Sequence, residues 1–528
     1  MVQAGEYGVS LNLRCGISVT LSACLLFLAF PPFHFLLPSF VALIPITSWI
    51  VEQKNSKAGS YRALWGGFFF GVVYGGLILH WVPITLWKTS PWVMPAYLAL
   101  VVLLAFPKAC FAWILHRLVH RAGVPVCLAL AFSWTALEWS LANLPGAFSF
   151  PWLELGTSLT GYPEVVGSAE LIGTRGVTFW IALLNGLLFE LIIGFRHSIK
   201  VYRLLLRTAA IVLIFSIPTA WGFLRSNSLS VTRVGEVAIV QPNIIGKTSM
   251  STRAITDSTL SVLSKLNMDR IGQSADLIVL PEATFWTRIE VDTVTQQEMS
   301  EVFKNWPAPV LVGGIGLTST EYKSTEYNSS FLFDPREGLT NFRYDKHYLV
   351  PWFETMPLSL FGWRTRSRNF SEYGRGNELS IGEFFGGTKF GVLICYESIF
   401  SEHSRLLRMD GADILVNITN DAWLQSEWRT VLYRTLAFWQ HPAHLVMRAI
   451  ENRVGIVRSS NTGFSFFVDP LGHVYGELES SQLAVGSSPV YSTEGPTLYT
   501  RVGDLAGLSS FLATVLMLVI VRFRFYGA

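Results

Sequence analysis

The stretch Phe390-Gly391-Val392-Leu393-Ile394-Cys395-Tyr396-Glu397 is a short apolar run that ends at a cysteine and a carboxylate. Such a run predicts a β-strand that is buried on both faces. Similar runs lie at Val237-Ala238-Ile239-Val240, at Leu277-Ile278-Val279-Leu280 and at Ile414-Leu415-Val416, and helical patterns alternate with them. Residues 233–495 are therefore predicted to form an α/β domain whose sheets are covered by helices.

Residues with reactive side chains stand where these predicted strands end. Glu282, Cys395 and Asp421 each follow an apolar run, and Lys346 follows a strand-like segment in Tyr344-Asp345-Lys346-His347. Loops at strand ends shape the active sites of α/β folds, so we expect these side chains to lie at one edge of the domain. Taken singly, a strand-end glutamate, a loop lysine and a strand cysteine are more often structural or solvated. Their combination favours a catalytic site.

Cys395 is the one cysteine of this domain, so it has no partner there for a disulfide. The other cysteines lie in or beside long apolar runs elsewhere in the chain: Cys15, Cys24, Cys110 and Cys127. A buried cysteine is either a small apolar core residue or a reactive thiol. A thiol becomes a strong nucleophile when a base removes its proton, and Glu282 is the candidate base. The Lys346 ammonium is the candidate to stabilise a thiolate and an oxyanion, which gives a predicted Glu282–Lys346–Cys395 triad.

The composition indicates a membrane protein. Of the 528 residues, 51% are hydrophobic and 15% are charged, whereas soluble domains carry about 25% charged residues. The net charge of +3 gives no reason to expect a nucleic-acid partner. Residues 1–225 contain long apolar runs, residues 230–500 resemble a soluble domain, and residues 505–521 are apolar again.

The apolar runs predict about eight transmembrane helices, since one span needs roughly 20 apolar residues. The Pro31-Pro32 pair favours a tight hairpin between the first two spans, and residues 11–30 are expected to be a retained span rather than a cleaved signal peptide. Residues 1–225 would hold seven spans and residues 505–524 the eighth. The predicted spans are 16–30, 33–51, 63–86, 92–115, 123–142, 174–195, 204–223 and 505–522.

Basic residues cluster in the loops on one side of these spans, which predicts that both termini are cytoplasmic. The α/β domain, which follows the seventh span, would then lie outside the cytoplasm. Two charged residues within the runs, Lys108 and Glu138, are expected near span ends. The basic residues on the predicted cytoplasmic side are Arg14, Lys54, Lys57, Arg62, Arg117, Arg121, Arg196, Lys200, Arg203, Arg207, Arg522 and Arg524.

The motifs around the predicted triad resemble those of the nitrilase, or carbon–nitrogen hydrolase, superfamily. Spans on both sides of the domain, together with the segment from Lys346-His347-Tyr348-Leu349 to Val350-Pro351-Trp352-Phe353-Glu354, are similar to the apolipoprotein N-acyltransferase branch. The resemblance implies a four-layer αββα sandwich with a Glu–Lys–Cys triad. The other matching motifs are Leu280-Pro281-Glu282-Ala283, Gly391 to Glu397, Asn420-Asp421-Ala422-Trp423, Arg448-Ala449-Ile450-Glu451 and Ser460-Asn461-Thr462-Gly463.

The resemblance also implies an acyl transfer in two halves. A membrane phospholipid would acylate Cys395, and the N-terminal amine of a diacylglyceryl-cysteine lipoprotein would then take the acyl group. The expected location is the bacterial inner membrane, with the domain facing the periplasm. No metal or nucleotide cofactor is expected, and Gly313-Gly314-Ile315-Gly316 fits a turn better than a nucleotide loop.

Supporting roles follow for several further residues. Lys346 and a backbone N–H near Tyr396 would hold the oxyanion, and Glu354 would orient Lys346 or the attacking amine. Glu397 either supports the pocket or is a structural carboxylate. Trp352 and Trp423 are predicted to bind substrate. The apolar loop residues Trp352, Phe353, Leu358, Leu360, Phe361 and Trp363 either line a path for lipid tails or pack on the bundle.

The sequence departs from the pattern of this branch at two places. Met250 stands where a tryptophan is usual, and Trp286 is a candidate to supply that contact. Leu424-Gln425 replaces a Phe-Gly pair after Trp423, and a longer stretch containing Trp428 and Trp439 follows. These departures affect loop conformation and acyl-chain contacts rather than the predicted triad.

Two alternative functions stay open at this stage. A membrane-tethered nitrilase-type amidase or hydrolase would use the same triad with water as the acceptor. A non-catalytic transporter or an inactive, lipoprotein-binding paralogue would share the membrane topology, although transporters place more charged residues inside their spans. Oligomeric state cannot be predicted from the sequence.

Overall fold

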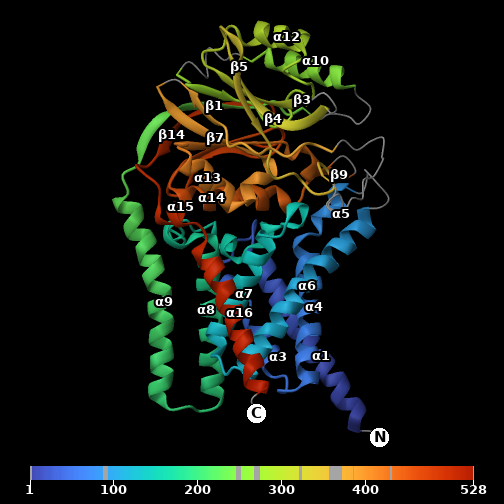
Figure 1. The fold of residues 1–528 in the computed structure, drawn as a ribbon, viewed down its shortest axis with the longest axis vertical. Coiled ribbons are helices and arrows are strands. Elements are labelled where there is room, and N and C mark those ends of the chain that lie inside the picture. The colour runs from blue at the N-terminus through green and yellow to red at the C-terminus, as the bar shows by residue number, and fades with distance from the viewer. Residues whose placement is uncertain are drawn as a thin grey trace.

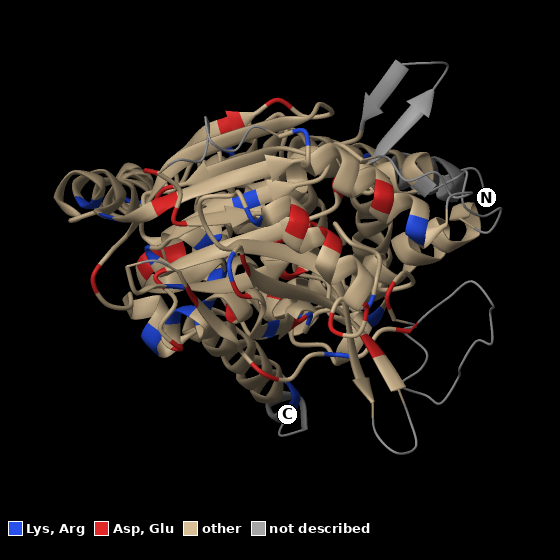
Figure 2. Cartoon of the chain, turned by 90° about the horizontal axis from the view of Figure 1, so that it is seen from above, with Lys and Arg blue, Asp and Glu red and all other residues tan. Residues whose placement is uncertain are grey.

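The chain folds as a bundle of long helices that carries an α/β domain at one end (Figure 1). The structure is a computed structural model and describes residues 3–86, 93–244, 251–266, 274–319, 324–355, 372–384, 386–428 and 431–526. Both chain ends lie at the end of the bundle that is far from the α/β domain (Figure 1). Seen along the long axis, acidic and basic residues are interspersed over the domain (Figure 2).

The predicted spans all overlap apolar helices. Among the described residues, five helices are long and apolar enough to cross a membrane, and three shorter apolar segments lie at Leu13–Ala29, Leu36–Val51 and Val126–Ala142. The number of candidate membrane-spanning helices is therefore five by length alone, and it reaches the predicted eight when the three short segments are included. The bundle helices are α1 (Gln3–Ala29), α2 (Leu36–Val41), α3 (Ile44–Val51), α4 (Lys57–Ile78), α5 (Trp81–Leu86), α6 (Val93–His120), α7 (Val126–Ala142), α8 (Ala169–Arg196), α9 (Val201–Ser228) and α16 (Leu505–Tyr526).

Two expectations about the bundle have different outcomes. The chain does turn at Pro31-Pro32, between the end of α1 at Ala29 and the start of α2 at Leu36. The expectation that Lys108 lies near a span end is wrong, because it lies in the middle of α6 and its side chain is buried.

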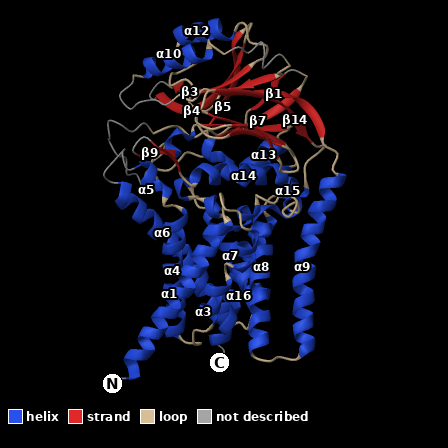
Figure 3. Ribbon diagram, turned by 180° about the vertical axis from the view of Figure 1, so that it is seen from behind, coloured by secondary structure: helices blue, strands red, loops and turns tan. Residues whose placement is uncertain are grey.

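In the part of the α/β domain that the structure describes, the strands form two six-stranded sheets and a hairpin, and they gather above the helical bundle (Figure 3). One sheet has the order β14-β1-β2-β3-β4-β5 and the other β13-β12-β11-β8-β7-β6. The strands are β1 (Thr232–Gln241), β2 (Leu277–Val279), β3 (Val310–Ser319), β4 (Ser324–Asp334), β5 (Gly338–Asp345), β6 (Ile381–Phe384), β7 (Thr388–Ile394), β8 (Ile414–Thr419), β11 (Gly455–Ser460), β12 (Ser465–Val468), β13 (Val474–Leu478) and β14 (Ala484–Ser492). A separate hairpin pairs β9 (Gln425–Trp428) with β10 (Val431–Arg434).

Alternate side chains of the central strands point into different layers of the domain. In β1, Val237 and Ile239 pack into the core between the two sheets, whereas Ala238 and Val240 face α10 (Thr252–Leu263) and α12 (Thr293–Phe303). Leu393 and Leu415 of the second sheet pack against α13 (Ser401–Met409) and α14 (Ala437–Asn452). Helices therefore cover the outer face of each sheet, which explains the continuous apolar runs. The predicted αββα sandwich is confirmed.

The prediction of a turn at Gly313-Gly314-Ile315-Gly316 is wrong, because these residues lie within β3 and pair with β4. A Cβ atom on Gly313 would lie 2.6 Å from both Pro281 O and Ala283 N. Glycine at this position thus lets β3 approach the backbone around Glu282 closely.

The bundle and the domain share one hydrophobic core. Buried residues of the bundle such as Trp134 belong to the same cluster as Tyr396, Phe438 and Met447 of the domain. Buried polar contacts join the two parts as well. Arg453 Nε lies 2.8 Å from Glu170 Oε2, and Arg448 Nη2 donates a hydrogen bond to Thr174 Oγ1 at 2.7 Å. The domain is therefore fixed on the bundle rather than connected to it by a linker.

Candidate active site

The structure brings Glu282, Lys346 and Cys395 together between the two sheets. Glu282 follows β2, Lys346 follows β5 and Cys395 follows β7. The Lys346 side chain is fully buried, and its Nζ atom lies 3.1 Å from Glu282 Oε1 and 3.0 Å from Glu354 Oε1. Glu354, predicted from the sequence as a supporting residue, thus shares the same ammonium as Glu282.

Asn328 was not predicted, and it connects the two carboxylates. Its Nδ2 atom donates hydrogen bonds to Glu282 Oε1 at 2.8 Å and to Glu354 Oε1 at 2.6 Å. The other Glu282 oxygen accepts a bond from the backbone N–H of Asn420 at 2.9 Å, and the other Glu354 oxygen accepts one from Val350 N at 2.7 Å. Both carboxylates are therefore held in one orientation by donors on each side.

Charge and burial set the protonation of this group. Burial alone would lower the pKa of the Lys346 ammonium, but Glu282 and Glu354 outweigh it and raise that pKa well above its usual value. Burial, reinforced by the Glu282 charge, raises the pKa of the Cys395 thiol far above its usual range, and Lys346 opposes this only in part. The resting pair is thus an ammonium and a neutral thiol. The thiol needs a base at the moment of attack.

The Cys395 backbone adopts a conformation that residues with side chains rarely take. Its φ angle is +50°, in the left-handed region, at the junction of β7 and the 3-10 helix η5 (Cys395–Ile399). Such strain persists only where the surroundings enforce it. The sharp turn places the thiol at the end of a rigid strand, where it interacts electrostatically with Glu282 and Lys346.

Glu397 has contacts that fit a structural carboxylate. Its Oε2 atom accepts hydrogen bonds from Ile394 N at 2.7 Å and from the Tyr344 hydroxyl at 2.8 Å. Its Oε1 atom accepts bonds from the backbone N–H groups of His347 at 2.6 Å and Tyr348 at 3.2 Å. The carboxylate therefore connects the end of the Cys395 strand to the loop that carries Lys346.

Asp421 follows its strand as predicted but lies within a different buried cluster. Its Oδ2 atom lies 2.6 Å from Arg458 Nη2, and its Oδ1 atom lies 3.4 Å from His441 Nδ1. Burial would raise the pKa of Asp421, but Arg458 and His441 outweigh it and hold that pKa below its usual range. Asp421 is thus the charge partner of Arg458 rather than a further acid or base at the thiol.

The predicted substrate-binding tryptophans lie in different surroundings. Trp352 is 56% exposed, whereas Trp423 is half-buried between Trp81 and Phe353, with ring centroids 5.9 Å and 5.6 Å away. The Tyr396 ring is buried against the bundle, and its hydroxyl donates to Ser149 O at 3.3 Å. Trp286 is 45% exposed and Leu424 is buried. Met250, Leu358, Leu360, Phe361 and Trp363 lie outside the described residues.

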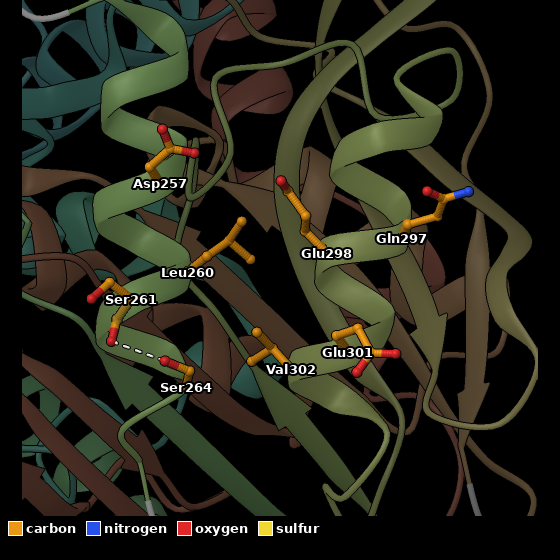
Figure 4. A pocket seen from close by; sticks show the side chains of 8 residues that line it. All are labelled: Asp257, Leu260, Ser261, Ser264, Gln297, Glu298, Glu301 and Val302. Atoms are coloured by element: carbon orange, nitrogen blue, oxygen red, sulfur yellow. Dashed lines mark hydrogen bonds between the residues drawn. The ribbon is translucent and has the colours of Figure 1, made fainter.

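A surface groove elsewhere has none of this chemistry. It lies between α10 and α12, on the outer side of the first sheet (Figures 1 and 4). Its lining includes Asp257, Glu298 and Glu301, and the first two pair with Arg253. Across the described ranges, no three His, Cys, Asp or Glu side chains form a group that could hold a metal ion. The candidate site is therefore the Glu282–Lys346–Cys395 group.

Comparison with known proteins agrees with this architecture. Residues 22–187 match the family described as apolipoprotein N-acyltransferase N-terminal domain, and residues 236–488 match the carbon–nitrogen hydrolase family. The apolipoprotein N-acyltransferase of Geobacter metallireducens is 28% identical, over 93% of this chain and 92% of that protein. Over nearly its whole length, the chain is similar to apolipoprotein N-acyltransferases. The apolipoprotein N-acyltransferase of Haemophilus influenzae is 27% identical, over 90% of this chain and 89% of its own length.

Two solved structures each cover about half of this chain. A mutant of the amidase from Nesterenkonia sp. AN1 covers 52% of this chain and 98% of its own, with 15% identity and a TM-score of 0.35. Nit3 of Saccharomyces cerevisiae, a nitrilase-superfamily member, covers 50% of this chain and 93% of its own, with 19% identity and a TM-score of 0.35.

Proposed function

We propose that this protein transfers a fatty acyl chain from a membrane phospholipid, through a thioester on Cys395, to the N-terminal amine of a diacylglyceryl-cysteine lipoprotein. The observation that carries the proposal is a buried thiol, ammonium and pair of carboxylates in a domain that is fixed on a membrane bundle. Both substrates keep their acyl chains in the bilayer and their reacting groups at its surface. A domain held at that surface can reach both.

In the first half of the reaction, Glu282 takes the proton of the Cys395 thiol as sulfur attacks the ester carbonyl of the phospholipid. Lys346 and a backbone N–H near Tyr396 stabilise the oxyanion that forms. The intermediate collapses, the ester C–O bond breaks, and Glu282 returns the proton to the departing lysophospholipid oxygen. The raised pKa of the Cys395 thiol supports this concerted use of a base.

In the second half, the free amine of the lipoprotein attacks the thioester carbonyl. The same donors stabilise the oxyanion, and Glu282 accepts the proton that the amine loses. The C–S bond breaks, Cys395 recovers a proton, and an amide is formed. Glu354, which shares the Lys346 ammonium with Glu282, keeps that ammonium in place and orients the amine.

The proposed location is the inner membrane of a bacterium, with the α/β domain in the periplasm. The chain ends lie at the opposite end of the bundle from the domain. Basic residues concentrate in the loops and helix ends on the side of the termini, including Lys54 before α4, Lys57 at the first position of α4 and Arg196 at the end of α8. Cytoplasmic loops carry such an excess of lysine and arginine.

Trapping the half-reaction tests the proposal. The purified protein is incubated in detergent with phospholipid alone, and mass spectrometry should find a hydroxylamine-labile acyl group on Cys395. Adding a diacylglyceryl lipopeptide should discharge that group into an amide. Cys395→Ala should abolish both products, while Cys127→Ala, which removes a cysteine buried in the bundle, should retain them. Release of free fatty acid without amide would instead identify a hydrolase.

A further inference from the structure

A loop of the membrane bundle contacts the residues around the candidate nucleophile. This loop joins α7 to α8, and its short helix η2 (Pro151–Leu153) presents Trp152 to the α/β domain. The Trp152 ring is stacked on His441, with ring centroids 5.7 Å apart and planes 13° apart, and it also faces Tyr396 at 6.5 Å. Its Nε1–H donates a hydrogen bond to Gln440 Oε1 at 3.0 Å. Trp152 is thus held by both a stacking and a polar contact.

His441 connects Trp152 to Cys395. Its Nε2 atom lies 3.0 Å from the carbonyl oxygen of Cys395. A carbonyl oxygen only accepts hydrogen bonds, so Nε2 bears the proton and donates. On the other side of the ring, Nδ1 lies 3.2 Å from Arg458 Nη2 and 3.4 Å from Asp421 Oδ1. The imidazole is therefore fixed from both sides, and it holds the carbonyl of the residue with the strained φ angle of +50°.

The loop itself is anchored by a carboxylate inside the bundle. Glu138 of α7 accepts hydrogen bonds from Leu155 N at 2.8 Å and from Thr178 Oγ1 at 2.7 Å. Thr178 Oγ1 also accepts a bond from Gly156 N at 2.9 Å. Two consecutive backbone N–H groups of the loop, just after η2, are thus tied to Glu138 directly or through Thr178.

Glu138 and its surroundings are buried inside the bundle, near the end of α7 that leads into this loop. Glu138 is 4% exposed and also accepts a bond from Trp134 Nε1 at 2.7 Å. Lys108 is 6% exposed, and its Nζ lies 3.7 Å from the centre of the Trp134 ring. Phe150 and Leu153 of the loop line a small cavity together with these two charged residues. Ionisable groups inside a membrane are costly, and they are kept where they serve a function.

We propose that Glu138 is a positioning residue for Cys395: it fixes the α7–α8 loop, Trp152 of that loop holds His441, and His441 holds the Cys395 carbonyl. The inference rests on the proposed function, because it takes Cys395 as the acylated nucleophile. Its consequence is that a carboxylate in the membrane bundle controls the rate of chemistry in the α/β domain.

A single-turnover experiment tests the inference. Phospholipid at saturating concentration is mixed with enzyme in detergent, and the acyl-Cys395 adduct is followed by mass spectrometry. If the residue positions Cys395, its substitution lowers the rate constant of adduct formation. If the residue is merely structural, its substitution lowers the final amount of adduct, which measures how much of the enzyme is folded. Glu138→Gln and Trp152→Leu should each slow the rate constant roughly 10- to 100-fold, the scale expected for a small misplacement of a reacting group. The KM for phospholipid should stay unchanged, and Trp152→Phe, which can still stack, should recover most of the rate.

Matched controls come from the same bundle. Glu190 of α8 also accepts a backbone hydrogen bond, from Cys127 N at 3.0 Å, and Trp139 of α7 packs on Phe511. Glu190→Gln and Trp139→Leu should keep the wild-type rate constant. If Glu138→Gln yields too little folded protein, Thr178→Val loosens the same anchor without changing a charge and should slow the reaction by a smaller factor.

Wild-type rate constants in the Glu138, Thr178 and Trp152 variants would overturn the inference, as would an equal slowing in the two controls. The absence of any Cys395 adduct in the wild-type protein would overturn the proposed function instead. The two failures are therefore distinguishable.

Discussion

Removing the Asn328 side chain should slow acylation of Cys395 without preventing the protein from folding. One nitrogen of this residue donates to Glu282 at 2.8 Å and to Glu354 at 2.6 Å. A hydrogen bond to a charged group contributes about 1.5–3 kcal/mol. If the bond to Glu282 is fully used in the transition state, its loss corresponds to a rate decrease of roughly 10- to 100-fold, at about 1.4 kcal/mol for each factor of ten.

The physical reason is orientation. Without Asn328, Lys346 is the remaining side chain that holds the Oε1 atoms of both Glu282 and Glu354. The two like charges are then free to separate, and Glu282 no longer faces the thiol in a single orientation. Asn328→Asp should be more damaging at neutral pH, because it places a third carboxylate beside one ammonium.

The assay is the single-turnover formation of the acyl-Cys395 adduct, with the unfolding midpoint measured in parallel. Asn185 provides a matched control, since it is a buried asparagine of the bundle that accepts a bond from Leu43 N at 2.9 Å and donates to Ser39 O at 3.0 Å. Asn185→Ala should lower the unfolding midpoint and leave the rate constant unchanged. A rate constant for Asn328→Ala within twofold of wild type would refute the reasoning.

Three further predictions concern stability. Glu397→Gln should cost roughly 2–6 kcal/mol of unfolding free energy in a denaturant titration, because the new NH2 group replaces one carboxylate oxygen and the two donors to that oxygen lose their acceptor at about 1–3 kcal/mol each; an unchanged midpoint would contradict this. Arg458 and His441 outweigh burial and hold the pKa of Asp421 low, so ionised Asp421 stabilises the fold above its ordinary pKa and this stabilisation is lost as the pH falls. Arg458→Met should therefore cost about 3–5 kcal/mol at neutral pH, and its unfolding midpoint should be less sensitive to acid than that of wild type, because burial then raises the pKa of Asp421 with less opposition. Burial and Glu282 raise the pKa of the Cys395 thiol, so the unfolded chain ionises first and stability should fall as the pH rises above about 8.5. In Cys395→Ala, the unfolding midpoint should depend less on pH above that value than in wild type.

The residues of the proposed triad could be predicted because Glu282 and Cys395 follow apolar runs and Lys346 follows a strand-like segment, and the end of each is visible in the sequence. Glu282, Lys346 and Cys395 need only the order of strands and the rule that strand ends converge. Asn328 gives a weaker signal. It is a polar residue in the middle of a strand whose following residues are buried, in Tyr327-Asn328-Ser329-Ser330. That pattern indicates an inward-facing polar group but does not identify its partners, which come from the segments after β2 and after β5.

The membrane contacts could not be predicted, because they depend on how the bundle packs against the domain. Trp152 and Gln440 are 288 positions apart in the chain and meet in one hydrogen bond. Aromatic residues near span ends are common at a membrane surface, so a tryptophan there carries no specific signal. Lys108 is expected near a span end because charges are rare in mid-membrane; in the structure its Nζ lies 3.7 Å from the centre of the Trp134 ring, and Lys108 lines a small cavity together with Glu138.

The backbone around Cys395 is held from two directions. Glu397 accepts a bond from Ile394 N and so connects the cysteine to the loop of Lys346, while His441 donates to the Cys395 carbonyl and is stacked on a membrane loop. The first contact sets the distances among the reacting groups. The second sets the position of the thiol relative to the bundle, and the bilayer fixes the height at which a phospholipid presents its ester. An acyltransferase that uses lipids must satisfy both conditions, because sulfur and carbonyl carbon have to meet within a few tenths of an ångström of the productive geometry. A hydrolase with a soluble substrate needs only the first condition, the correct distances among the reacting groups.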